Sequence, residues 1–232
     1  MKILAIDTST SRFSVALSDG EKILAERNIV LTKVLENSII PVIDSVLKKA
    51  KTPLAKLDGF AVGLGPGSFT SLRVGVSTIK AFCLATDKPV VGIPSLDIIA
   101  QGVNLPKGQV CVITDARRNL VYAAIYRKEG SRLKQISDYL LVPMDELLNK
   151  ISQDTLFTGD AVDIFKNNII ERKNKFKSVF VSKSFWYPES RHLVQLSLKR
   201  FKENRIDNPH KLLPLYLYPE DCQVDKKEIR GN

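Results

Sequence analysis

Histidine and cysteine are scarce in this chain of 232 residues, which contains two histidines and three cysteines. His192 and His210 lie 18 residues apart, and no His-x-x-x-His pair is present. The cysteines stand singly without a Cys-x-x-Cys pair, which excludes a zinc ribbon and indicates reduced thiols in the cytosol. Because catalytic zinc needs several protein ligands close together, the sequence predicts no metal site.

Long hydrophobic runs are also missing. Asp7 interrupts the apolar N-terminus before it reaches the length of a signal peptide, and no stretch approaches a membrane span. With 44% apolar residues, the chain can still bury one large core or two small ones. These features predict a globular cytoplasmic protein without membrane contact.

Basic residues are in excess, with a formal net charge of +10, and the excess is uneven. Residues 1–102 hold 12 Lys and Arg against 9 Asp and Glu, whereas residues 103–232 hold 23 against 16. The run from Lys166 to Lys183 has six basic side chains and one acidic. Such a run is typical of a solvated face, but it can also neutralise RNA phosphates. The RNA contacts predicted from it are Arg172, Lys173, Lys175 and Lys177.

A glycine-rich turn lies between an apolar run and a helical pattern, and reads Gly-Leu-Gly-Pro-Gly-Ser-Phe-Thr-Ser-Leu-Arg from Gly63 to Arg73. Closely spaced glycines let the backbone turn sharply and leave amide N–H groups unblocked, as phosphate-binding loops require. No Gly-Lys-Ser/Thr follows, so the turn is not a Walker A loop, and the third glycine comes too early for Gly-x-Gly-x-x-Gly. A tight strand-to-helix turn without a ligand is the alternative.

Two segments of the chain open alike, each with an apolar strand that ends in an aspartate and is followed by a hairpin partner. The first strand covers Ile3–Ile6 and ends at Asp7; the second begins near Gly108 and ends at Asp115, with its partner from Leu120. The repeat predicts an α/β protein of two ribonuclease-H-like domains with mixed sheets, the architecture of actin. In such a fold Asp7 would face a nucleotide or metal, whereas its simpler role is to hydrogen-bond the turn that follows.

The predicted first domain covers residues 1–102 and the second residues 103–212, since the segment 102–108 is rich in turn formers. Residues 213–232 are expected to pack back on the first domain. Helices are predicted over Thr32–Lys51, Thr70–Thr86 and Glu189–Glu203, and strands over Gly59–Gly63 and Val90–Ile93.

Three strings, Ile-Asp-Thr-Ser-Thr from Ile6, Gly-Leu-Gly-Pro-Gly-Ser-Phe-Thr-Ser-Leu-Arg-Val-Gly from Gly63, and Asp-Ala-Arg from Asp115, resemble the TsaB (YeaZ) family. The likeness returns at Leu215-Tyr-Leu-Tyr, where Tyr218 replaces the arginine of the family's terminal Tyr-Leu-Arg. The resemblance implies an actin-like (ASKHA) fold and an accessory subunit without a cofactor. It further implies that the subunit supports TsaD, with TsaE, in forming N6-threonylcarbamoyladenosine at A37 of ANN-decoding tRNAs. Contact with tRNA would come through that complex, and the chain alone would pair with a second copy.

In the TsaB family, the two helices predicted in the first domain form the face shared with TsaD or with a second TsaB. Each carries an apolar stripe at helical spacing, which is also what an ordinary core helix shows. The partner interface predicted from these stripes comprises Leu35, Ile39, Val42, Ile43, Val46, Leu72, Val76, Ile79, Phe82 and Cys83. A vestigial nucleotide cleft is predicted at Asp7, Thr8, Ser9, Gly65, Gly67 and Ser68.

The residues offer no catalytic set, because the two aspartates that end strands lack a lysine or a second acid at a fixed spacing. The expected protein is therefore not an enzyme on its own. Two other functions stay open: an active small-molecule kinase of the actin and sugar-kinase superfamily, and a stand-alone RNA-binding module.

Overall fold

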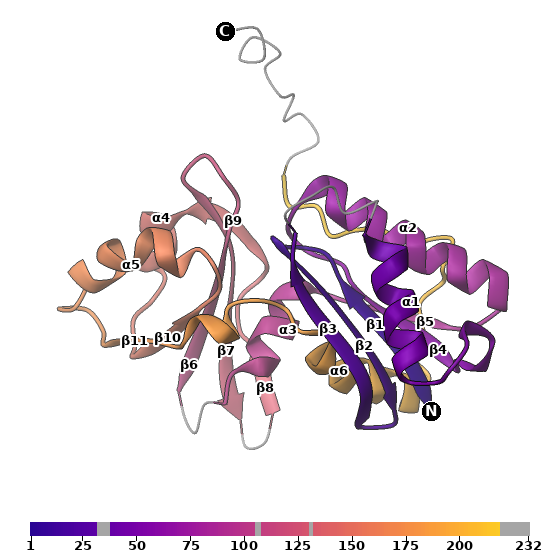
Figure 1. Ribbon diagram of the computed structural model, residues 1–232. Coiled ribbons are helices and arrows are strands. Elements are labelled where there is room, and N and C mark those ends of the chain that lie inside the picture. The colour runs from indigo at the N-terminus through magenta and orange to yellow at the C-terminus, as the bar shows by residue number, and fades with distance from the viewer. Residues whose placement is uncertain (32–37, 105–107, 130–131, 219–232) are drawn as a thin grey trace, which may run out of the picture.

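The computed structural model describes residues 1–31, 38–104, 108–129 and 132–218. Two mixed sheets lie side by side, one in each half of the molecule (Figure 1). The first sheet has the strand order β3-β2-β1-β4-β5, in which β1, β2 and β3 are antiparallel neighbours and β4 and β5 continue parallel to β1. Its strands are β1 (Lys2–Asp7), β2 (Arg12–Asp19), β3 (Lys22–Val30), β4 (Gly59–Gly63) and β5 (Val90–Ile93).

The second sheet repeats this pattern in the order β11-β10-β6-β7-β8, with β9 also paired to β7. Here β6 and β7 are antiparallel, and β10 and β11 continue parallel to β6. The repeat confirms the predicted actin-like α/β fold of two ribonuclease-H-like units. The strands are β6 (Gln109–Asp115), β7 (Leu120–Glu129), β8 (Arg132–Gln135), β9 (Leu140–Pro143), β10 (Thr155–Thr158) and β11 (Ser178–Phe180).

Helices cover both faces of the first sheet, which explains why β1 is apolar throughout. Leu4 and Ile6 point to the face covered by α1 (Ile39–Lys49) and α2 (Phe69–Thr86), where they share one core with both helices. Ile3 and Ala5 point to the opposite face and pack against α6 (Ser190–Lys202). Because successive side chains of a strand alternate between faces, a strand buried on both sides must be hydrophobic at every position.

The remaining helices belong to the second half or lie between the halves. α4 (Met144–Asn149) and α5 (Val162–Glu171) share the core of the second sheet with Phe157 of β10. α3 (Ser95–Gly102) packs its apolar side chains against β6 and β7, so it joins the two halves. The described residues also contain two short 3-10 helices, η2 (Leu54–Lys56) and η3 (Lys183–Phe185).

The chain returns to the first half after completing most of the second. α6, which the predicted division at residue 212 assigns to the second domain, packs on the first sheet. Asp207 then forms a bridge to Val90 at the edge of that sheet, and Leu212 enters the core beneath α1 and α2. The boundaries at residues 102 and 212 stay a prediction, but residues 190–212 pack with the first sheet. Residues 213–218 follow the first half as far as its border with the second, and residues 219–232 lie outside the described ranges.

Predicted elements match best where apolar runs are bounded by turn formers. The two predicted strands coincide with β4 and β5, and α2 begins one residue before its predicted start. The first helix begins at Ile39 instead of Thr32, and residues 32–37 lie outside the described ranges. Neither α3 nor the short strands β9 and β11 were predicted.

Candidate functional site

Asp7 ends β1 at the border between the halves and is completely buried. One carboxylate oxygen accepts hydrogen bonds from the Ser9 amide (2.8 Å) and the Ser9 hydroxyl (2.7 Å). The other accepts a hydrogen bond of 2.6 Å from the Ser95 hydroxyl of α3. The Asp7 carboxylate therefore closes its own turn and ties that turn to the first residue of α3.

The glycine-rich turn packs directly on this aspartate turn. The Gly65 amide donates to the Ser95 hydroxyl (3.0 Å), and the Ser68 amide donates to the Ser9 carbonyl (2.8 Å). A Cβ atom on Gly67 would overlap the Ser9 carbonyl oxygen, so glycine is required there for the close approach of two backbones.

The predicted cleft residues are thus brought together, but they bind one another. Thr8 donates its hydroxyl to the Ser71 carbonyl of α2 (2.8 Å), and the Ser68 hydroxyl donates to the Ser71 hydroxyl (3.0 Å). Three of the amide groups that a phosphate-binding loop could offer to a ligand, those of Ser9, Gly65 and Ser68, donate to protein oxygens instead. The arrangement has the form of a nucleotide-binding loop and the contacts of a structural turn.

Asp115, the counterpart of Asp7, ends β6 and shapes a similar turn. Its carboxylate accepts a hydrogen bond from the Arg117 amide (2.8 Å) and pairs with the Arg117 guanidinium (3.2 Å). The Asp115 amide in turn donates to Asp160 (3.0 Å). Arg117, Arg118 and Asn119 all have left-handed backbone, with φ of 65°, 52° and 60°, which is uncommon for residues other than glycine. Nothing in the residue types of this turn, apart from Asn119, favours that conformation.

The predicted partner residues divide into buried and partly exposed side chains. Seven of them are at most 3% exposed and lie in the core of the first half, so they are not available to a partner. These seven are Ile39, Ile43, Val46, Leu72, Val76, Ile79 and Cys83. Val42 and Phe82 are half-buried at the margin of that core, and Leu35 lies outside the described residues.

Other side chains form the outer surface of the two helices. On α2, Leu84 is 62% exposed, and the small residues Ala81 and Ala85 are exposed beside it. On α1, Ile40 is 50% exposed. The helical stripes in the sequence identified the core side of these helices, because burial in a core and burial in an interface leave the same periodicity.

The predicted RNA contacts lie between α5 and β11, on the outside of the second half. Lys173, Lys175 and Lys177 are exposed, and no carboxylate of the described residues forms an ion pair with them. Arg172 differs, since its guanidinium pairs with Asp145 at 3.0 Å.

A half-buried acid between the halves carried no signal in the sequence. Asp97 of α3 accepts hydrogen bonds from the hydroxyls of Tyr126 (2.6 Å) and Tyr139 (2.8 Å) on the same carboxylate oxygen. Burial raises the pKa of Asp97, and the two hydroxyls oppose that shift. The contact joins α3 to the second sheet, and only the fold brings these three residues together.

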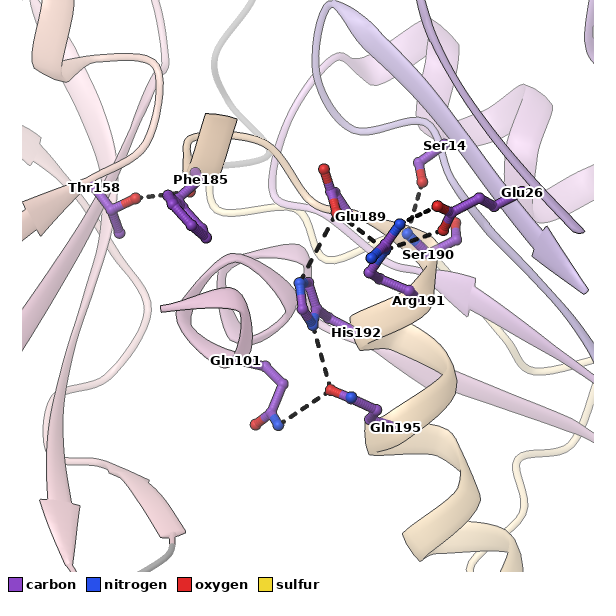
Figure 2. Close-up of polar contacts among 10 residues, drawn as sticks. All are labelled: Ser14, Glu26, Gln101, Thr158, Phe185, Glu189, Ser190, Arg191, His192 and Gln195. Carbon is purple, nitrogen blue, oxygen red and sulfur yellow. Dashed lines mark hydrogen bonds and ion pairs between the residues drawn. The ribbon is translucent and has the colours of Figure 1, made fainter. Parts of the chain in front are cut away.

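A further crossing between the halves lies at the start of α6 (Figure 2). On the second half, the Thr158 hydroxyl donates to the Phe185 carbonyl (2.8 Å). Five residues later, the Ser190 amide donates to the Ser14 hydroxyl of the first sheet (2.6 Å). The segment from Phe185 to Ser190 is therefore anchored to the second sheet at one end and to the first sheet at the other.

One of the two histidines takes part in this crossing. Figure 2 shows the ring of His192 between α6 and α3, where its Nδ1 lies 3.3 Å from the amide oxygen of Gln195. Gln101 of α3 reaches the same oxygen at 3.4 Å, and Arg191 pairs with Glu26 of β3. His192 therefore takes part in helix packing. Across the described ranges, no three His, Cys, Asp or Glu side chains are grouped so that they could hold a metal ion.

Three carboxyl groups, that of the buried Asp7 and those of the half-buried Asp97 and Asp160, predict an unusual response to pH. Burial raises the pKa of Asp7, Asp97 and Asp160 above the ordinary value of 3.8. The native state then keeps protons that the unfolded chain has already lost, so these groups make the free energy of unfolding fall as pH rises from 3.8 through their raised pKa values. We expect the free energy of unfolding of Asp97→Asn, minus that of the parent, to increase with pH across that window. Urea unfolding at several pH values measures this, and a difference that stays constant with pH would contradict it.

Comparison with known proteins places these features in a family. The family model described as TsaD, tRNA N6-adenosine threonylcarbamoyltransferase, matches residues 30–224. The tRNA threonylcarbamoyladenosine biosynthesis protein TsaB of Haemophilus influenzae is 32% identical over 243 aligned positions, which cover 100% of this chain and 98% of that protein. The fold is similar to that of an uncharacterized protein with similarity to peptidase YeaZ from Pseudomonas aeruginosa, with a TM-score of 0.80 and 23% identity. The match covers 94% of this chain and 99% of that chain. A glucomannokinase from Arthrobacter has the same fold, with a TM-score of 0.51 and 12% identity. The match covers 85% of this chain and 99% of that chain.

No helix among the described residues has the length and apolar composition needed to span a bilayer.

Proposed function

Because this chain belongs to the TsaB (YeaZ) family, whose members act in tRNA threonylcarbamoyladenosine biosynthesis, we propose that it is a non-catalytic cytoplasmic subunit for TsaD. In this role it binds TsaD, works with TsaE, and supports formation of N6-threonylcarbamoyladenosine at A37 of ANN-decoding tRNAs. The observation that carries the proposal is the likeness to TsaB over the full length of the chain.

The geometry of the aspartate turns supports the non-catalytic part of the proposal. In the kinase alternative, Asp7 and the glycine-rich turn would have to receive a nucleotide and a metal. Asp7 instead accepts three internal hydrogen bonds, and the Gly67 backbone lies against the Ser9 carbonyl. A nucleotide phosphate would have to displace protein groups from both turns. The same contacts disfavour peptidase chemistry at this position.

Reconstitution tests the proposal. The chain mixed with TsaD and TsaE should co-elute with TsaD. With an activated threonylcarbamoyl donor supplied, the modified nucleoside should form on substrate tRNA only when all three proteins are present. The isolated chain should turn over neither ATP nor a peptide. ATP turnover by the isolated chain that disappears in Asp7→Ala would favour the kinase, and salt-sensitive tRNA binding without TsaD would favour the RNA module.

The proposed partner face is the outer surface of α1 and α2. Exposed apolar side chains on two neighbouring helices favour contact with another protein, and the small Ala81 and Ala85 allow a second helix to approach closely. A matching pair of helices from TsaD would complete a four-helix contact, and a second copy of the chain would do so in its absence.

We expect Leu84→Glu to weaken association with TsaD by about 30-fold, because a charge placed in a desolvated contact costs about 2 kcal/mol. The free energy of unfolding should change by less than about 0.5 kcal/mol, since Leu84 is 62% exposed in the free chain. Val179→Glu, at a 54% exposed site on β11, is the matched control and should leave binding unchanged. Isothermal titration with TsaD measures the affinity of both variants. Equal affinities of Leu84→Glu and Val179→Glu for TsaD would place the interface elsewhere.

We also propose that Lys173, Lys175 and Lys177 contact tRNA in the assembled complex. They are exposed, unpaired within the described residues and close together in the chain, which suits the phosphate backbone. Replacing all three by glutamate should weaken tRNA binding by the complex. The decrease of log K with log salt should also become less steep, by about 3 in the slope. An unchanged slope would mean that this run is a solvated face without RNA contact.

A further inference from the structure

The last described residues connect the two halves of the molecule. The segment runs along α2 towards the border between the halves (Figure 1, yellow). Lys80 of α2 donates to the carbonyls of His210 (3.2 Å) and Leu212 (3.3 Å), which holds the start of the segment on the first half. Residues 215–218, here called the strap, then continue from the first half to the second.

The first end of the strap is fixed at the glycine-rich turn. The Leu215 amide donates to the carbonyl of Leu64, the residue directly after β4 (2.8 Å). The Tyr216 hydroxyl accepts a hydrogen bond from Arg73 (3.1 Å), and its ring lies 5.2 Å from the ring of Phe69 at the start of α2. The Arg73 guanidinium also covers the Phe69 ring at 3.8 Å. Backbone and side-chain contacts thus hold the strap at this end.

The second end is fixed at the turn after β6. The Tyr218 hydroxyl donates to the carbonyl of Ala116, the residue directly after Asp115 (2.7 Å). The Tyr218 ring meets Tyr122 of β7 edge to face, with centroids 6.1 Å apart. Leu217 and Tyr218 pack on the cluster that also contains Ala116 and Leu96 of α3. The Tyr218 end therefore belongs to the core between the halves.

Both anchors of the strap lie at the carboxyl ends of strands. Leu64 follows β4 and Ala116 follows β6, so the strap passes over the carboxyl ends of a central strand in each sheet. Open α/β sheets bind their ligands outside the carboxyl ends of their strands. In this protein, the strap itself lies outside the carboxyl ends of β4 and β6.

We propose that residues 215–218 are an internal clamp that covers the ligand position of the fold and holds the two halves in one orientation. A small-molecule enzyme of this architecture needs the halves to part so that ligand can enter. Here the clamp has a hydrogen bond and an aromatic contact at each end, so the halves part only when one end is released.

Distance measurement between spin labels tests the clamp in the full chain. Labels at Ser77→Cys on α2 and Asn168→Cys on α5 occupy exposed sites in different halves. Cys222→Ser removes the cysteine of the tail, and Cys83 and Cys111 are buried, with the pKa of the Cys83 thiol raised by burial to about 11. The labelled chain is diluted in an excess of unlabelled chain, so that pairing of copies through α1 and α2 adds no distance between labels. The parent should then give one narrow distance distribution. Tyr218→Ala should broaden it towards longer distances, and Tyr187→Phe, a tyrosine outside the strap, should not.

A milder variant keeps the test valid if Tyr218→Ala fails to fold. Tyr218→Phe retains the ring and loses one hydrogen bond, so the opened form should be about fivefold more populated. Amide hydrogen exchange of Leu215, whose amide bonds to the Leu64 carbonyl at the other end of the strap, should then accelerate about fivefold relative to Tyr187→Phe. A narrow distribution in Tyr218→Ala, or unchanged exchange of the Leu215 amide in Tyr218→Phe, would each overturn the proposal.

Discussion

Replacing Gly67 by alanine should lower the free energy of unfolding by about 3 kcal/mol or more, a larger loss than most single substitutions cause. The added Cβ would overlap the Ser9 carbonyl oxygen, and it would lie 2.8 Å from the carbonyl carbon. Both obstacles are backbone atoms of a buried turn, so no side-chain rotation can relieve the overlap. The two turns would have to separate, which would also weaken the hydrogen bond from the Ser68 amide to the Ser9 carbonyl.

Gly20→Ala is the matched control for this substitution. Gly20 has a φ of +56° but no heavy atom within 4 Å of an added Cβ, so only backbone strain of about 1 kcal/mol is expected. Urea unfolding of both variants separates the effect of close approach from the effect of conformation. Equal losses would mean that the glycine-rich turn moves freely away from Ser9, contrary to the packing described above.

Asp7→Ala should cost about 3 to 5 kcal/mol, because it leaves the Ser9 amide, the Ser9 hydroxyl and the Ser95 hydroxyl without their shared acceptor. Each of these donors is buried, so water cannot replace the carboxylate without opening the site. Thermal and chemical unfolding of the purified variant measure the loss.

Asp7→Asn distinguishes a structural acceptor from a charged catalytic group. Its amide oxygen can accept two of the three hydrogen bonds, but its NH₂ group faces the remaining donor, so we expect an intermediate loss of about 1 to 3 kcal/mol. Reconstituted tRNA modification should persist with Asp7→Asn wherever the variant is folded. Loss of modification by a stably folded Asp7→Asn protein would contradict the structural role.

The architecture could be predicted because each sheet begins with the same recognisable sequence pattern. A strand that ends in aspartate and is followed by a hairpin occurs twice, and the structure places both at the same position of matching sheets. Strands β4 and β5 are uniformly apolar and bounded by glycine or proline, so their ends were clear. α3 was missed because it is only eight residues long and ends in glycine within a segment rich in turn formers. β11 has three residues inside the basic run, too few to show a period.

The site was harder to predict than the fold. The sequence grouped Asp7, Ser9 and the glycine-rich turn correctly, but Ser95, which joins them, lies 88 residues away from Asp7. The apolar stripes on α1 and α2 named the core residues Ile43 and Ile79, because periodicity cannot tell which element covers a helix. The Asp97 contact with Tyr126 and Tyr139 depends on a packing of α3 against the second sheet that no local pattern reveals.

The late return of the chain to the first sheet has a consequence for synthesis on the ribosome. Ile3, Ala5 and Ala16 face Leu193, Val194 and Leu198 of α6, so one side of the N-terminal sheet has no cover until those residues leave the exit tunnel. The nascent chain must carry that apolar surface while the whole second half is being translated. Pairing across such long sequence separations slows folding and prolongs exposure to aggregation. The N-terminal half is therefore the part of the nascent protein that most needs chaperone protection.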